Sequence, residues 1–125
     1  MFLHQDWLMR QIGRLTIAIA QLIFGKGSKE YDLKEELGTK QTAILQRTLC
    51  ELLANGRLGK AEDLLFSSLD PSDQTSLAVA LNFYQQANEL SDAALERQGF
   101  TREELWEGLG EAVKLYGIYL PGFWD

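Results

Sequence analysis

Two short segments place a lysine directly after a glycine, a combination found in phosphate-binding loops. Residues 55–65 read NGRLGKAEDLL, and residues 24–29 read FGKGSK. The nucleotide-binding motif G-x-x-x-x-G-K-[ST] follows a strand, and its hydroxyl residue binds Mg²⁺. In the first segment Gly56 and Gly59 are three positions apart instead of five, and Ala61 replaces the hydroxyl residue. The second segment also lacks the spacing, and both follow helical patterns. We therefore expect no nucleotide site.

Residues that bind transition metals or act as nucleophiles are scarce. The chain has one histidine, His4, and one cysteine, Cys50, on different predicted elements. A zinc site needs several such ligands, and a di-metal site in a helical bundle needs Glu-x-x-His pairs. Cys50 lies beside apolar Leu49 and Leu53, where a small buried thiol is common, and its helix has no histidine to activate it. The sequence predicts no metal, no cofactor and no catalytic residue.

A stripe of carboxylates is the remaining candidate for chemistry. Glu103, Glu107 and Glu111 recur every four residues along the last predicted helix. Three acids on one stripe could bind a cation or a basic partner. An acidic stripe opposite an apolar face is more often simply solvated, and we expect that here. An enzyme that uses carboxylates of the C-terminal half is a less favoured alternative.

The charge distribution argues against a nucleic-acid partner. The chain has 125 residues, the size of one domain, and a net charge of −6. Residues 1–60 contain nine Lys and Arg against six Asp and Glu, whereas residues 61–125 contain three against twelve. Phosphate binding depends on clustered cations, which the acidic half lacks. The asymmetry could instead orient one copy of the chain on another, or attract a basic protein.

No segment is apolar enough to predict a membrane span. The least polar run, residues 15–25, has 11 residues without a charge, whereas a spanning helix needs about 20. The start of the chain also lacks the pattern of a signal peptide. A single cysteine fits a reducing compartment, so we expect a cytoplasmic protein.

Hydrophobic periodicity predicts an all-α fold, a compact bundle of five to six helices in a single domain, residues 1–125. We divide the chain into an N-terminal apolar helix (1–25), a polar linker or short helix (26–40), a helical core (41–117) and an aromatic tail (118–125). The first helix covers residues 5–24, because apolar residues recur there at steps of three and four: Leu8, Ile12, Leu15, Ile19, Leu22 and Ile23. Other apolar residues widen this face. The helix must therefore be central in the bundle or covered by a second copy.

Local signals set the ends of the later helices. Asn55-Gly56 ends one helix, and Asp70 and Pro71 suit the cap and first position of the next. Ser91 starts a short helical turn. Thr101 and Glu104 have the spacing of a capping box, which predicts the start of the last helix, and Gly117 ends it.

Aromatic side chains supply the candidate interaction surface. Tyr119, Phe123 and Trp124 crowd the tail, and Trp7 lies on the first helix. Aromatic residues are frequent anchors at protein interfaces. The tail could equally fold back over the bundle, and both possibilities stay open.

The segment Leu45–Leu69, LQRTLCELLANGRLGKAEDLLFSSL, resembles a tetratricopeptide-type helix pair. Gly56, Leu58, Ala61 and Leu65 match that repeat's turn glycine, turn apolar residue, small contact residue and large apolar residue. Its usual small residue in the first helix is replaced by Leu49, and no second copy of the repeat is evident.

The whole chain resembles a family of uncharacterised bacterial helical proteins, a domain of unknown function. The opening QDWLMRQIGRLTIAIAQLIFGK and the closing LSDAALERQGFTREELWEGLGEAVKLYGI carry this likeness. The resemblance implies a cytoplasmic bacterial protein and implies no activity.

We therefore expect a non-catalytic protein–protein interaction module that binds a partner protein or a second copy, with a homodimer plausible. The candidate surface is Trp7, Tyr119, Phe123 and Trp124. The alternative is a small-molecule sensor with an apolar pocket lined by residues such as Phe83, Tyr84 and Trp106.

Overall fold

The computed structural model describes residues 2–24 and 40–120, and these form helices without any strand. The predicted all-α fold is confirmed. The predicted linker or short helix at 26–40 lies almost entirely outside the described residues. The six described helices are α1 (Phe2–Phe24), α3 (Lys40–Ala54), α4 (Leu58–Ser68), α5 (Gln74–Asn88), α6 (Asp92–Arg97) and α7 (Arg102–Leu115).

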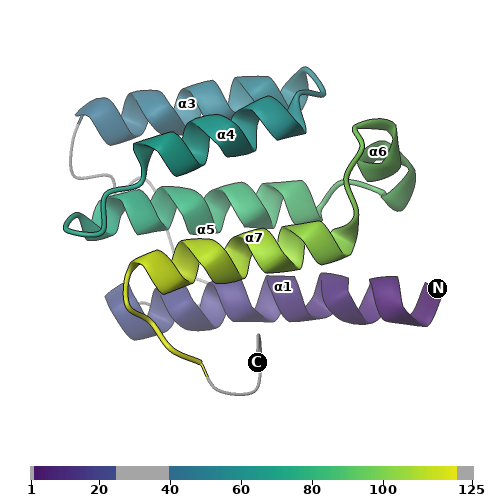
Figure 1. Ribbon diagram of the computed structural model, residues 1–125, viewed down its shortest axis with the longest axis horizontal. Helices are drawn as coiled ribbons and strands as arrows, with labels where there is room; N and C mark the ends of the chain where they lie inside the picture. Colours follow the sequence, from purple (N-terminus) through teal and green to yellow (C-terminus); the bar gives the residue numbers. More distant parts are fainter. Residues whose placement is uncertain (1, 25–39, 121–125) are drawn as a thin grey trace.

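Helix α5 is the centre of the bundle. Figure 1 shows the α3–α4 pair on one side of it and the α1–α7 pair on the other, with short α6 beyond one end. Helix α5 contacts α1, α3, α4 and α7. It buries both apolar and small polar residues, from Ser76 to Asn88. A helix covered on several sides needs apolar residues around most of its circumference, and the α5 sequence provides them.

Helix α1 packs its predicted apolar face against α5 and α7. Leu8, Ile12 and Ile19 are at most 2% exposed. The same face was expected to include Leu22, and this was wrong, because Leu22 is 67% exposed. At about 100° per residue, position 22 lies about 80° from Ile12 round the helix, at the edge of the buried face and in the last turn of α1.

Helices α3 and α4 form the predicted helical hairpin. Gly56 makes the corner with a positive φ of 72°, a conformation that side-chain-bearing residues rarely adopt. Leu58, Ala61 and Leu65 are 0% exposed, which agrees with the packing roles inferred from the sequence. The likeness to a tetratricopeptide repeat stays a prediction.

The start of α5 differs from the sequence prediction. Asp73 is the cap, since its carboxylate accepts a hydrogen bond from the Thr75 backbone N–H at 3.0 Å. Asp70 instead accepts from the backbone N–H and hydroxyl of Ser72, at 3.0 and 2.7 Å. An aspartate that closes its own turn in this way is not available to cap a helix. Pro71 therefore lies in the turn and not in the helix.

The starts of α6 and α7 follow the predicted signals. Ser91 caps α6, and Thr101 and Glu104 form the complete capping box of α7. Glycine 117, with a φ of 74°, follows the last helix as expected.

A buried arginine joins four helices near the end of α5. The Arg102 side chain is 2% exposed, and its guanidinium donates to the carbonyl oxygens of Asn88 at 2.6 Å and Leu90 at 3.0 Å. It also pairs with the Asp92 carboxylate at 2.6 Å. The Asn88 side chain donates in turn to the Met9 carbonyl of α1 at 2.8 Å. The last carbonyls of a helix lack intrahelical partners, and Arg102 donates to that of Asn88, the last residue of α5.

We expect Arg102→Met to lower the free energy of unfolding by about 3 kcal/mol, because it leaves two carbonyl acceptors without their donor. Urea denaturation followed by circular dichroism measures this change. The control is Arg97→Met, at an exposed position of α6, which we expect to stay within about 0.5 kcal/mol of the parent. Equal effects of the two substitutions would show that Arg102 does not hold the helix ends together.

Candidate functional site

Two of the four residues predicted as an interaction surface, Trp7 and Tyr119, lie within the described residues. Trp7 on α1 is 47% exposed, and its ring packs against Trp106 of α7 with the ring centres 6.5 Å apart. Tyr119, just after α7, is 70% exposed. Phe123 and Trp124 lie outside the described residues. The two predicted residues that are described thus both present much of their surface to solvent.

Helix α7 bridges these two aromatic residues. Tyr119 shares a small pocket of about 240 Å³ with Glu107, Gly110, Glu111 and Lys114 of α7. Gly110 is one turn after Trp106, so both lie on the same flank of the helix. We call Trp7, Trp106 and Tyr119 the aromatic surface.

The start of the tail packs on its own chain. Ile118 and Leu120 are partly buried against the core, while Tyr119 between them points outward. Tyr116 is also held within the chain, since its hydroxyl bonds to Ser76. Burial raises the pKa of Tyr116 above its ordinary value. Of the two described aromatic residues near the chain end, Tyr116 is therefore held within the chain and Tyr119 is exposed.

The pocket expected for a small-molecule sensor is filled by its own side chains. Phe83 and Tyr84 are 1% and 0% exposed, and their rings pack edge to face at 5.0 Å. Trp106 lies elsewhere, against Trp7. The three residues named for that pocket thus belong to the core and to the aromatic surface.

Cys50 lies in a row of amide side chains between α3 and α5. Its thiol accepts from the Gln46 amide at 3.2 Å and donates to the Gln86 side-chain oxygen at 3.5 Å. Gln46 and Gln86 both donate to Asn82, at 2.5 and 2.8 Å. The neighbours of Cys50 are amides, which cannot accept its proton as a catalytic base would.

The predicted carboxylate stripe is exposed along α7 at Glu103, Glu107 and Glu111. Within residues 2–24 and 40–120, no group of three or more His, Cys, Asp or Glu side chains is arranged to hold a metal ion. Over the same residues, no helix is both long and apolar enough to cross a membrane.

A buried acid–phenol pair beside this stripe was missed by the sequence analysis. The Tyr84 hydroxyl donates to the Glu62 carboxylate at 2.6 Å, joining α5 to α4. Burial raises the pKa of Glu62, the Tyr84 hydrogen bond opposes this, and the charges of Asp63, Glu104 and Glu111 raise it further. Burial, together with the Glu62 charge, also raises the pKa of Tyr84.

Gly108 of α7 makes room for this pair. A Cβ at position 108 would come closer than 3.0 Å to both the Tyr84 hydroxyl and the Glu62 carboxylate. The sequence held one signal of this contact, because a glycine inside a helix costs about 1 kcal/mol relative to alanine and usually has a packing reason.

Fold and surface together define an all-helical domain with an exposed aromatic surface. The model of DUF6483, a family of unknown function, matches residues 2–117, and the chain belongs to this family. The resemblance to a helical family of unknown function is therefore confirmed, while a bacterial origin stays a prediction. Neither the curated proteins nor the solved structures gave a match.

We expect Gly108→Ala to destabilise the protein by about 1–2 kcal/mol, because the clash with Tyr84 and Glu62 outweighs the gain in helix propensity. The matched control is Gly59→Ala on α4, where the added Cβ would meet Phe100 at an ordinary 3.6 Å. Urea denaturation should show the control at or above parental stability. A Gly108→Ala variant as stable as the control would contradict the close approach of α7 to Glu62.

The raised pKa of Glu62 gives a second prediction. The folded state holds the Glu62 proton more tightly than the unfolded chain, so ionisation of Glu62 removes stability as pH rises above its ordinary pKa. Glu62→Gln cannot ionise. Its stability relative to the parent should therefore increase from pH 4 to pH 8, measured by urea denaturation across this range. Glu96→Gln, at an exposed position of α6, removes the same charge and should show a smaller trend.

Proposed function

We propose that this protein is a non-catalytic protein–protein interaction module that uses the aromatic surface as its contact. The exposure of Tyr119 and Trp7 is the observation that supports this proposal most. Tyr119 is 70% exposed and Trp7 is 47% exposed, although large aromatic side chains favour burial. Tryptophan and tyrosine are also the residues most enriched among the energetic anchors of interfaces.

Another exposed apolar residue lies further along α1, on the side of the helix that carries Trp7. Leu22 is 67% exposed and lies within about 60° of Trp7 round the helix, four turns away. Exposed apolar residues that gather on one side of a molecule are typical of contact surfaces, whereas isolated ones are ordinary. This supports a contact along α1 and the chain after α7.

A second copy of the chain is the partner we favour. A contact with two-fold symmetry uses the same residues from both copies. The aromatic surface, on adjacent α1 and α7, could supply both sides of such a contact. The single cysteine is compatible with a reducing compartment such as the cytoplasm.

The sensor alternative has less support. The pocket beside Tyr119 has a volume of about 240 Å³, below the roughly 300–1,000 Å³ of ordinary small-molecule sites, and the larger depression of about 400 Å³ beside Phe66 and Leu115 contains none of the residues expected for the sensor pocket. Phe83 and Tyr84 fill the core and leave no exposed surface for a ligand.

Light scattering after size exclusion tests the proposal over a range of protein concentrations. We expect the parent to self-associate and Tyr119→Ser to raise the dissociation constant about tenfold, which corresponds to about 1.4 kcal/mol. The control is Ile44→Ser, because Ile44 is a 49% exposed apolar residue on α3, away from the aromatic surface. Two results together would argue against the interaction module. The parent would stay monomeric, and a pull-down with the parent would recover no protein that is missing from the same pull-down with Tyr119→Ser.

A further inference from the structure

A second surface, on the opposite flank of α7, combines acidic and apolar side chains. A depression of about 400 Å³ lies between α4 and α7 and is lined by Phe66, Glu111, Lys114 and Leu115. Leu115 is 48% exposed, and Phe66 is partly buried against the core. Glu62 is one turn before Phe66 and continues the same flank of α4. We call Glu62, Phe66, Glu111 and Leu115 the α4–α7 groove.

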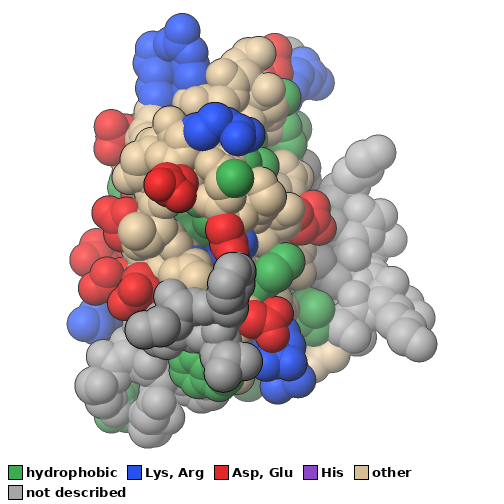
Figure 2. All heavy atoms as spheres, turned by 90° about the vertical axis from the view of Figure 1, so that its right-hand side faces the viewer, with side chains coloured by type: hydrophobic (Ala, Val, Ile, Leu, Met, Phe, Trp, Pro, Cys, Tyr) green, Lys and Arg blue, Asp and Glu red, His purple; other side chains and the backbone are tan. Residues whose placement is uncertain are grey.

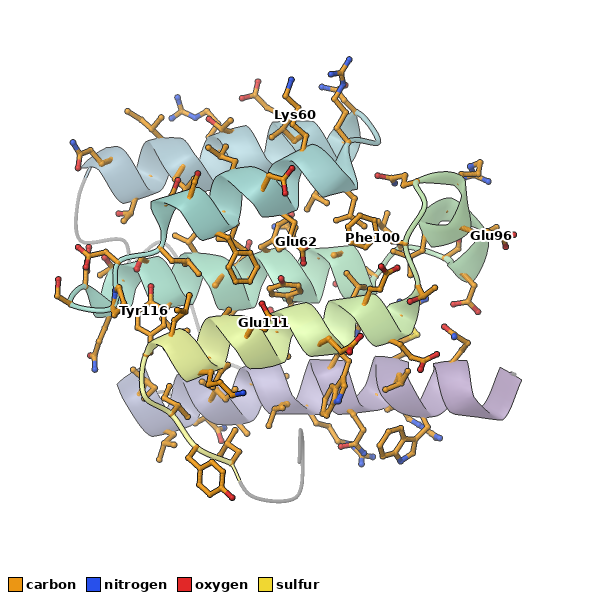
Figure 3. The ribbon with its side chains drawn as sticks, in the orientation of Figure 1. Lys60, Glu62, Glu96, Phe100, Glu111 and Tyr116 are labelled. Atoms are coloured by element: carbon orange, nitrogen blue, oxygen red, sulfur yellow. The ribbon has the colours of Figure 1, made fainter. Side chains whose placement is uncertain are left out.

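The groove has a strongly negative electrostatic environment. Figure 3 shows Glu62 and Glu111 pointing toward one another from the two helices, while Lys60 points away from the groove. In Figure 2 acidic side chains gather along the left edge, the side on which α4 and α7 lie. Lys114 contributes a positive charge at the end of the groove near Leu115.

Glu62 is the less exposed of the two groove carboxylates, Glu62 and Glu111. Its side chain is half-buried and accepts a hydrogen bond from the Tyr84 hydroxyl. Within the described part of the chain, no Lys or Arg side chain forms an ion pair with it. A half-buried carboxylate is costly to ionise without a positive partner, and nearby Glu104 and Glu111 increase this cost. A cation from outside the chain would lower it.

We propose that the α4–α7 groove binds a basic amphipathic segment of another protein. A Lys or Arg side chain of that segment pairs with Glu62 and Glu111, and an apolar side chain of the same segment packs on Phe66 and Leu115. Charge complementarity identifies this occupant, since an anionic groove repels nucleic acids and anionic membranes.

The size of the groove also suits a short segment. It spans about one turn of α4, from Glu62 to Phe66, and about one turn of α7, from Glu111 to Leu115, so two or three side chains from one face of a partner helix are enough to fill it. The groove adjoins the pocket beside Tyr119, because Glu111 and Lys114 line both, but it contains none of the aromatic side chains Trp7, Trp106 and Tyr119. This proposal therefore does not rest on the proposed function. Failure of either one leaves the other intact.

Nuclear magnetic resonance on the full-length protein tests the proposal. The probe is a synthetic 12-residue amphipathic peptide of lysine and leucine, and the matched negative probe has glutamate in place of lysine. We expect the lysine peptide to shift the backbone signals of Glu62, Phe66, Glu111 and Leu115 first. The glutamate peptide should leave them unchanged.

Two variants and one control separate specific pairing from general attraction. Glu62→Gln should weaken lysine-peptide binding about tenfold. Leu115→Ser should also weaken it, because the apolar contact is lost from an exposed position. Glu96→Gln removes the same charge from α6 and should weaken it less than about twofold. Binding to the parent should strengthen from pH 5 to pH 8 as Glu62, whose pKa is raised by burial and by the charges of Asp63, Glu104 and Glu111, ionises, and Glu62→Gln should reduce this dependence.

Four results would overturn the proposal. Equal losses in Glu62→Gln and Glu96→Gln would show attraction to net charge alone. Signal shifts centred on Trp7 and Tyr119 would place the peptide contact outside the groove. The absence of any signal shift at millimolar peptide would show that the groove does not bind the peptide. Shifts of the groove signals on dilution without peptide would show that a second copy of this chain is the occupant.

Discussion

The buried guanidinium of Arg102 is the interaction on which the arrangement of the bundle depends. A buried charge is costly unless hydrogen bonds surround it, and the final carbonyls of a helix are costly unless donors reach them. Arg102 solves both problems at once at the end of α5, and Asn88 extends the network to α1. The first residue of α7 is thereby fixed against α5, which sets the direction in which the rest of α7 runs.

That direction gives α7 two different flanks. One flank carries Trp106 against Trp7 and forms the aromatic surface with Tyr119. The other passes close to α4, where the missing side chain of Gly108 accommodates the Glu62–Tyr84 pair. Large aromatic side chains distinguish the first flank, and the buried carboxylate–phenol pair distinguishes the second. One helix therefore presents two chemically distinct surfaces to solvent, and both depend on how its N-terminus is anchored.

Much of the fold was predictable from the sequence, because the determinants are local. Periodicity located the helices, and the Thr101–Glu104 spacing located the start of α7. Side-chain partners between distant elements were not predictable. Arg102 looked like an ordinary residue of a first turn, and the Glu62–Tyr84 bond joins residues 22 positions apart. Asp70 and Asp73 have the same chemistry, so only the three-dimensional turn decides which one caps α5. For the aromatic surface, residue type indicated Trp7 and Tyr119, whereas the part played by Trp106 required the packing of α1 on α7.

The hydrogen bond between Asn88 and the Met9 carbonyl has a consequence for synthesis of the protein. It joins residues 79 positions apart, and the helices that cover α1 are α5 and α7. At about 5–20 residues per second, translation reaches Arg102 several seconds after α1 has been made. Helices α3 and α4 can pair as soon as both exist, because their contact is local. Helix α1 is therefore made before the other described helices, but its apolar face is fully covered only once α7 has been made, and this face stays open to aggregation until then.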